Sequence, residues 1–260
     1  MLRNLLITLL LASLRPAMAE AQWVDPRLVA GQVGFHVAVS FAGKLVFDRR
    51  EVGQAFREAL REGAVAGVIA HAGNTMAGRN AHLTLPAKLL VQKSTMITRR
   101  SIHRQAVFDA SLYSDWTLTH SFLHFRVEDL EPRVELDVAN AAVATYYLFA
   151  GPQYHFDSTR TLYTGSLVFR NDAPPANVLG YHVPGVIWID SAHQDDTSIL
   201  SHEVIHSFQA ERGASVADWH YRGLRFNPLA VLSGLPALLE GWPDHDHRLH
   251  EVEAIRYSGH

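Results

Sequence analysis

The chain has no cysteine among its 260 residues. This absence excludes a disulfide framework, a thiolate metal site and a cysteine nucleophile. An excess of one charge is also missing, because 23 Lys and Arg residues nearly balance 26 Asp and Glu residues. Without a strongly basic surface, non-specific binding to nucleic acid is disfavoured, and we expect no nucleic-acid partner.

Histidine is the residue type in clear excess, with 16 copies. Hydrophobic residues make up 48% of the chain and charged residues 19%, which is typical of a packed globular protein and excludes a disordered one. The length allows one large domain or two small ones. Because cysteine is absent, a bound metal would need His, carboxylate or carbonyl ligands.

Residues 1–19 have the pattern of a secretory signal peptide. Arg3 supplies the positive charge, residues 5–14 form an apolar run, and Ala17-Met18-Ala19 provides small residues before a cut preceding Glu20. The apolar run is shorter than the roughly twenty residues that a membrane span needs. We therefore expect an exported protein, in a bacterial periplasm or outside the cell, with no transmembrane span in the mature chain. The alternative is an uncleaved membrane anchor.

Residues 20–184 form an N-terminal α+β region of unknown role that carries several predicted strands. Phe35, Val37, Val39 and Phe41 share one parity, which predicts an extended segment. Helical spacing then predicts a helix from residue 49 that ends at Gly63, followed by turns at 71–80. The pattern over 87–104 fits helix or strand. Beyond it, the sequence predicts strands within 118–138 and 161–170, and a buried helix over 140–150.

Residues 185–260 form the metal-binding catalytic region, which we expect to continue the preceding part as one domain. A β-branched run at 185–190 predicts a strand, 191–196 a polar loop, and 197–212 a helix that stops at Gly213. Inside that helix stands His202-Glu203-Val204-Ile205-His206, an HExxH motif. A short strand, a loop and a helix that carries two histidines together indicate a metal site.

The spacing of the motif explains its chemistry. Residues four apart on a helix lie one turn apart on the same face, so His202 and His206 can bind one ion. Glu203 lies about a hundred degrees around the helix from His202, within reach of a metal-bound water. Together these groups supply a Lewis acid, an activated water and a base, and they predict a zinc-dependent hydrolase.

This segment resembles the HExxH metallopeptidases, the zincins. The resemblance implies an α+β fold with a mixed β-sheet packed on the motif helix, and a peptide or protein substrate. It also implies that the strand at 185–190 is the sheet edge along which the substrate lies. The metzincin branch is rejected, because Gln209 and Arg212 stand where its glycine and third histidine would be. The remaining pattern is gluzincin-like, with a glutamate from a later helix as third ligand.

Residues 238–244 are the first candidate source of that ligand. Glu240 would bind the metal, and Asp244, four residues later, would support a ligand histidine. Pro243 departs from the family pattern because it would end or kink a helix. The apolar run at 235–239 favours burial of Glu240, which makes it the first choice.

Residues 250–254 are the second candidate source. Glu251 and Ala254 match an ExxA variant of the same element, although Ile255 occupies the Asp position. Glu251 is therefore the second choice, with Glu253 beside it as a further alternative.

Three other residues are candidates for supporting roles. Gln209 lies three residues after His206 on the metal-facing side, where it could contact substrate or a ligand histidine. His220 and Tyr221 follow the motif helix, where zincins often keep a His or Tyr that stabilises the oxyanion. The sequence thus predicts an exported zinc metallopeptidase. The alternative is a non-catalytic periplasmic or cell-envelope protein for binding or assembly on the same scaffold.

Overall fold

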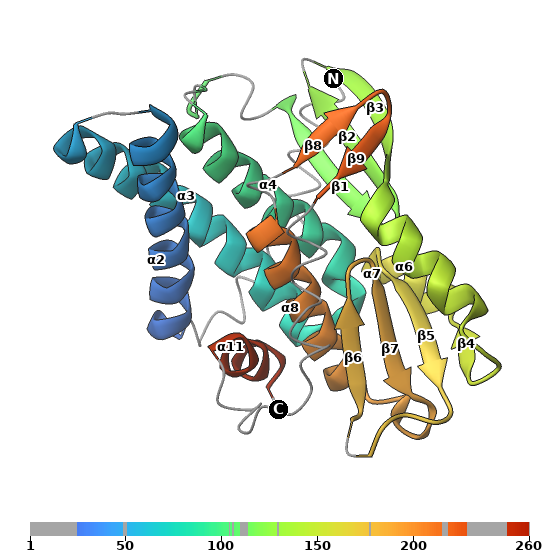
Figure 1. Cartoon of the computed structure of the whole chain (residues 1–260). Coiled ribbons are helices and arrows are strands. Elements are labelled where there is room, and N and C mark those ends of the chain that lie inside the picture. The colour runs from blue at the N-terminus through green and yellow to red at the C-terminus, as the bar shows by residue number, and fades with distance from the viewer. Residues whose placement is uncertain are drawn as a thin grey trace, which may run out of the picture.

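A computed structural model of the chain describes residues 25–48, 51–103, 105, 107–109, 114–128, 130–176, 178–214, 218–227 and 249–259. The predicted signal peptide lies outside these residues. The described chain is α+β, as expected, with helices and two mixed β-sheets. The long N-terminal helices lie to one side of the two sheets (Figure 1).

Three long helices open the described chain, and the first of them occupies the segment that the sequence predicted to be extended. They are α2 (Pro26–Gly43), α3 (Val52–Arg79) and α4 (Thr84–Ile102), with short helices η1 (Lys44–Asp48) and η2 (Ala81–Leu83) between them. The extended prediction is wrong because the alternation of Phe35 to Phe41 is incidental. The residues that α2 buries include Gln32, His36 and Ser40, which recur every fourth residue, the period of a helix.

The helix predicted from residue 49 is confirmed, but its predicted end at Gly63 is wrong. α3 continues to Arg79, through the segment predicted as turns. Gly63 and Gly67 lie where α3 packs on α2. A Cβ on Gly63 would be 2.6 Å from the backbone of Val37, and one on Gly67 would be 2.5 Å from the backbone of Val33. Glycine at these positions lets the two backbones approach closely.

The first sheet has the order β1-β2-β3-β9-β8, and every neighbouring pair is antiparallel except β3 and β9. Its strands are β1 (Trp116–His120), β2 (Leu123–Glu128), β3 (Glu131–Asp137), β8 (Trp219–Tyr221) and β9 (Leu224–Phe226). Of these, β1, β2 and β3 confirm the strands predicted within 118–138. α6 (Val138–Phe149) follows β3 directly and is capped by Asp137. The predicted helix is therefore present, but Tyr146, Leu148 and Phe149 are exposed, so it is only partly buried.

The second sheet has the order β4-β5-β7-β6, with β5 and β7 parallel. Its strands are β4 (Tyr154–Phe156), β5 (Leu167–Asn171), β6 (Gly180–Val183) and β7 (Val186–Asp190). The strand predicted over 161–170 is half wrong, because residues up to Thr164 form α7 (Ser158–Thr164). β7 is present as predicted but is an inner strand, so the expectation that it forms the sheet edge is wrong. The edge is β6.

Both faces of this sheet are covered, which explains why β7 is apolar at nearly every position. Ile187 and Ile189 pack against α8 (Thr197–Ala214) and α11 (Leu249–Ser258) in a core that also includes residues of α3 and α4. Trp188, on the opposite face, packs with Ala144 of α6. The core therefore joins residues from both sides of position 184.

Candidate metal centre

The motif helix α8 begins and ends close to the predicted positions. The polar loop before it contains a short helix, η3 (Ser191–His193), and Asp196 accepts a hydrogen bond from the backbone N–H of Ser198, 2.9 Å away. Val204, Ile205 and Phe208 are buried in the core. Because these residues fix one side of the helix inward, the two motif histidines lie on the neighbouring side, partly exposed and one turn apart.

The imidazoles of His202 and His206 converge on the carboxylate of Glu251. Their Nε2 atoms are 3.0 Å apart, and Oε2 of Glu251 is 3.2 Å from each of them. Donor atoms at zinc-ligand distance from one tetrahedral ion lie about 3.3 Å from each other. The three donors therefore fit one face of a zinc coordination tetrahedron, and two imidazoles with a carboxylate form a donor set that zinc accepts.

α11 brings Glu251 to this position. Ala254 and Tyr257, on the same helix, are buried in the core beside α8. Glu253 forms an ion pair with Arg212 at 3.2 Å, which ties α11 to the end of α8. Arg212, the residue that replaces the metzincin histidine, therefore holds the helix that carries Glu251. Glu253 does not join the histidine cluster.

Glu240 and Asp244 lie outside the described residues, so their predicted roles stay predictions. The second choice, Glu251, is the carboxylate that the structure places beside both histidines. Its side chain is buried and shares Oε2 between the two imidazoles.

Gln209 contacts His206, as in the second of its two predicted possibilities, contact with substrate or with a ligand histidine. Its Oε1 atom is 2.8 Å from Nδ1 of His206. An amide oxygen can only accept a hydrogen bond, so Nδ1 of His206 carries the proton. The neutral form of this ring then directs the lone pair of Nε2 toward the cluster, as a metal ligand requires.

Glu203 points toward the edge strand β6. A Cβ built on Gly180 of that strand would be 2.9 Å from both Cγ and Oε1 of Glu203, so only a glycine leaves room for this side chain. Burial raises the pKa of Glu203 to about 7, with Glu251 adding to the rise and His206 opposing it. A carboxylate with a pKa near 7 suits a general base that works at neutral pH.

His182 is a neighbour of the site that the sequence reasoning missed. It lies on β6 opposite Ile187, two residues from Gly180 and therefore on the same face of the strand. Burial, followed by the charge of His206, lowers the pKa of His182 to about 3. The available signal was strand alternation in residues 180–183, which puts residues 180 and 182 on one face.

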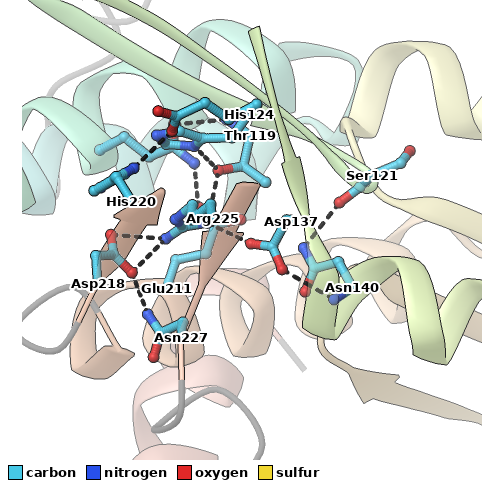
Figure 2. Close-up of polar contacts among 12 residues, drawn as sticks. Thr119, Ser121, His124, Asp137, Asn140, Glu211, Asp218, His220, Arg225 and Asn227 are labelled. Atoms are coloured by element: carbon cyan, nitrogen blue, oxygen red, sulfur yellow. Dashed lines mark hydrogen bonds and ion pairs between the residues drawn. The ribbon is translucent and has the colours of Figure 1, made fainter. Parts of the chain in front are cut away.

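His220 and Tyr221 lie on β8 and contact other groups. Nδ1 of His220 is 2.6 Å from Oε2 of Glu135, and Nε2 is 3.3 Å from a guanidinium nitrogen of Arg99. Figure 2 shows His220 beside a separate polar cluster around Arg225, which pairs with Asp137 and Asp218. The side chain of Tyr221 is exposed. Among the described residues, the contacts of neither side chain support the predicted oxyanion role.

No protein-family model matches this chain. No curated protein and no solved structure matches it either. Its resemblance to zincins therefore depends on the HExxH segment, and a function has to be argued from the geometry and chemistry of the site.

Proposed function

We propose that this chain is an exported, zinc-dependent hydrolase of peptide bonds with a zincin-like fold. The observation that carries the proposal is the arrangement of His202, His206 and Glu251 within 3.2 Å of one another beside the buried Glu203. Three protein ligands with one open position are the usual composition of a catalytic zinc site. The proposal of export depends on residues 1–19 alone.

The metal would supply a Lewis acid and an acidified water when it is bound by these three residues. Glu203 would act as general base toward the attacking water and would return the proton to the leaving amine. Gln209 keeps the proton of His206 on Nδ1, so that Nε2 remains available as a donor.

The edge strand β6 is the proposed binding surface for an extended peptide. In the described residues β6 pairs on one side with β7 and has no strand on its other side. An extended peptide can add to such an edge through main-chain hydrogen bonds. Since Gly180 of β6 contacts Glu203, a peptide beside this strand would pass close to the base.

The test combines metal content with one substitution. The purified protein should bind one zinc per chain and cleave members of a quenched fluorescent peptide library. Glu203→Gln should retain the zinc, since the ligands are unchanged, while hydrolysis falls at least about a hundredfold. A folded wild type that binds no zinc would contradict the proposal. A zinc-loaded wild type that cleaves neither peptides nor unfolded casein would favour a non-catalytic binding protein.

A further inference from the structure

The distribution of polar residues on α2 is the reverse of that on an ordinary surface helix. Such a helix turns its apolar residues inward and its polar residues to water. α2 and η1 bury Gln32, His36, Ser40 and Lys44, each at most 3% exposed. Several of their apolar residues are exposed on the outward side instead.

Three of these four buried residues, Gln32, His36 and Lys44, have polar partners inside the protein. Nδ1 of His36 lies 2.7 Å from Oγ1 of Thr98, and the ammonium of Lys44 lies 3.2 Å from Glu58 and 3.0 Å from Glu62. The helix also approaches α3 closely through Gly63 and Gly67, which are four residues apart. Helices in a lipid environment associate in this way, with small residues at the contact and polar groups paired inward.

The outward surface of α2 and η1 has no exposed charge between residues 28 and 47. We call Phe35, Ala38, Ala42, Val46 and Phe47, which are all exposed, the outer face. The ring of Phe56, itself exposed, lies 5.7 Å from that of Phe41 and extends the apolar surface onto α3. In Figure 1, α2 lies on the side of the molecule away from both sheets.

We propose that the outer face lies in the plane of a lipid bilayer, against its hydrocarbon boundary. Among the described residues, Pro26–Phe47 is the one helical stretch long and apolar enough to cross a membrane. An in-plane position is favoured over a crossing because Arg57 and Arg61 are exposed on α3, alongside the middle and the end of α2. A crossing would place these guanidinium groups at hydrocarbon depth, where charge is costly.

The charges that border the outer face suit a membrane surface. Arg27 precedes it, and Arg57 and Arg61 lie on α3, the helix that packs against α2, with all three side chains exposed. Among the side chains that the structure describes between Arg27 and Arg61, Glu51 is the exposed acidic one. Basic residues beside an apolar helix face add electrostatic attraction to anionic head groups. The interaction is independent of the proposed catalytic function.

The absence of cysteine allows a direct test with single labels. Ala38→Cys and Phe47→Cys place a fluorophore on the outer face, and Phe149→Cys places it on an equally apolar but distant position that is 83% exposed. The full chain is mixed with phosphatidylethanolamine and phosphatidylglycerol vesicles that contain a nitroxide-labelled lipid. Quenching should occur at positions 38 and 47 and not at 149, whether or not residues 1–19 have been removed.

A second measurement keeps the test independent of labelling. Phe47→Lys should weaken binding to the same vesicles about tenfold, because it removes a large apolar group from the contact, whereas Phe149→Lys should not. No quenching at positions 38 and 47, or equal quenching at 149, would overturn the proposal. Energy transfer between labels at position 38 on different molecules, in the absence of lipid, would also overturn it by showing that a second copy covers the outer face.

Discussion

Glu203, His206 and Glu251 form a small group of charges whose members shift one another. Burial lowers the pKa of His206, but hydrogen bonding to Glu251 and the charge of Glu203 outweigh it and raise the pKa to about 9. In the absence of a metal, the ring of His206 thus retains a second proton, which Nε2 donates to Glu251. A divalent cation can replace this proton and release it, so metal affinity should increase with pH.

The choice between Glu240 and Glu251 as third ligand can be tested with two matched substitutions. Glu251→Ala removes the carboxylate 3.2 Å from both imidazoles, so zinc affinity should fall by more than the 10–100-fold typical of an outer hydrogen-bond partner. Glu240→Ala should leave the affinity unchanged. Competition with a chelator gives both values, and equal losses or a larger loss for Glu240→Ala would restore Glu240 as the ligand.

The proximity of the two histidines could be predicted from the sequence, whereas the carboxylate beside them in the structure was only the second choice. The motif concerns residues within one turn of helix, so spacing alone brings His202 and His206 together. Glu251 comes from a helix 45 residues away, and the neighbourhood of Glu251 is polar in sequence. Its burial results from Ala254 and Tyr257, which turn one side of α11 into the core.

Helix α2 shows how an element can be misjudged when its environment is unusual. Phe35, Val37, Val39 and Phe41 alternate, which favours a strand if the apolar side is assumed to face a core. The informative period is that of the polar residues Gln32, His36, Ser40 and Lys44, which face inward every fourth residue. Apolar periodicity predicts secondary structure only when burial follows hydrophobicity.

The packing of α2 on α3 predicts a difference between two kinds of glycine. Gly63→Ala would push a methyl group to 2.6 Å from the backbone of Val37, which cannot move aside as a side chain can. We expect a loss of about 1–3 kcal/mol in the free energy of unfolding, the usual cost of overpacking.

Gly34→Ala is the matched control on α2 itself. No atom lies within 4 Å of the Cβ that this substitution adds, so it should be neutral or should stabilise the helix by up to about 1 kcal/mol. Denaturant unfolding of both variants measures the difference. Equal stability of Gly63→Ala and Gly34→Ala would show that the helices are not in close contact at Gly63.

At the scale of the whole molecule, the α+β class was predictable while the arrangement was not. The strands of residues 118–138 and 185–190 and the helix of residues 197–212 were each visible from local periodicity. That β7 is an inner strand depends on its pairing with β5 and β6 on both sides. Such long-range pairings are decided by the fit of both sheet faces against α6, α8 and α11, which a local pattern does not contain.

Buried neutral histidines in distant parts of the molecule give the whole chain a common sensitivity to acid. His36 lies between α2 and α4, and His124 lies on strand β2 of the first sheet, where its ring contacts Thr119 of β1. Burial, with Arg212 nearby, lowers the pKa of His36 to about 3, and burial, with Arg225 nearby, lowers that of His124 to about 2. Protonation would therefore have to occur largely in the unfolded chain.

The sign of the pH dependence follows from proton counts. Above pH 6.5 both histidines are neutral in the folded and unfolded chain, so they contribute no slope. Below pH 6.5 the unfolded chain binds protons that the folded chain rejects, so each histidine lowers the free energy of unfolding by about 1.4 kcal/mol per pH unit until its folded pKa is reached. His36→Gln and His124→Gln should each reduce the slope of the free energy of unfolding against pH between pH 6 and pH 4, by up to about 1.4 kcal/mol per pH unit, which corresponds to one proton. Above pH 7.5 the slope should be unchanged.

Unfolding by denaturant at several pH values measures these slopes. Because the slope and not the absolute stability is compared, a general loss of stability in a variant does not interfere. A slope between pH 6 and pH 4 that is identical in wild type and both variants would mean that neither histidine stays neutral in the folded protein.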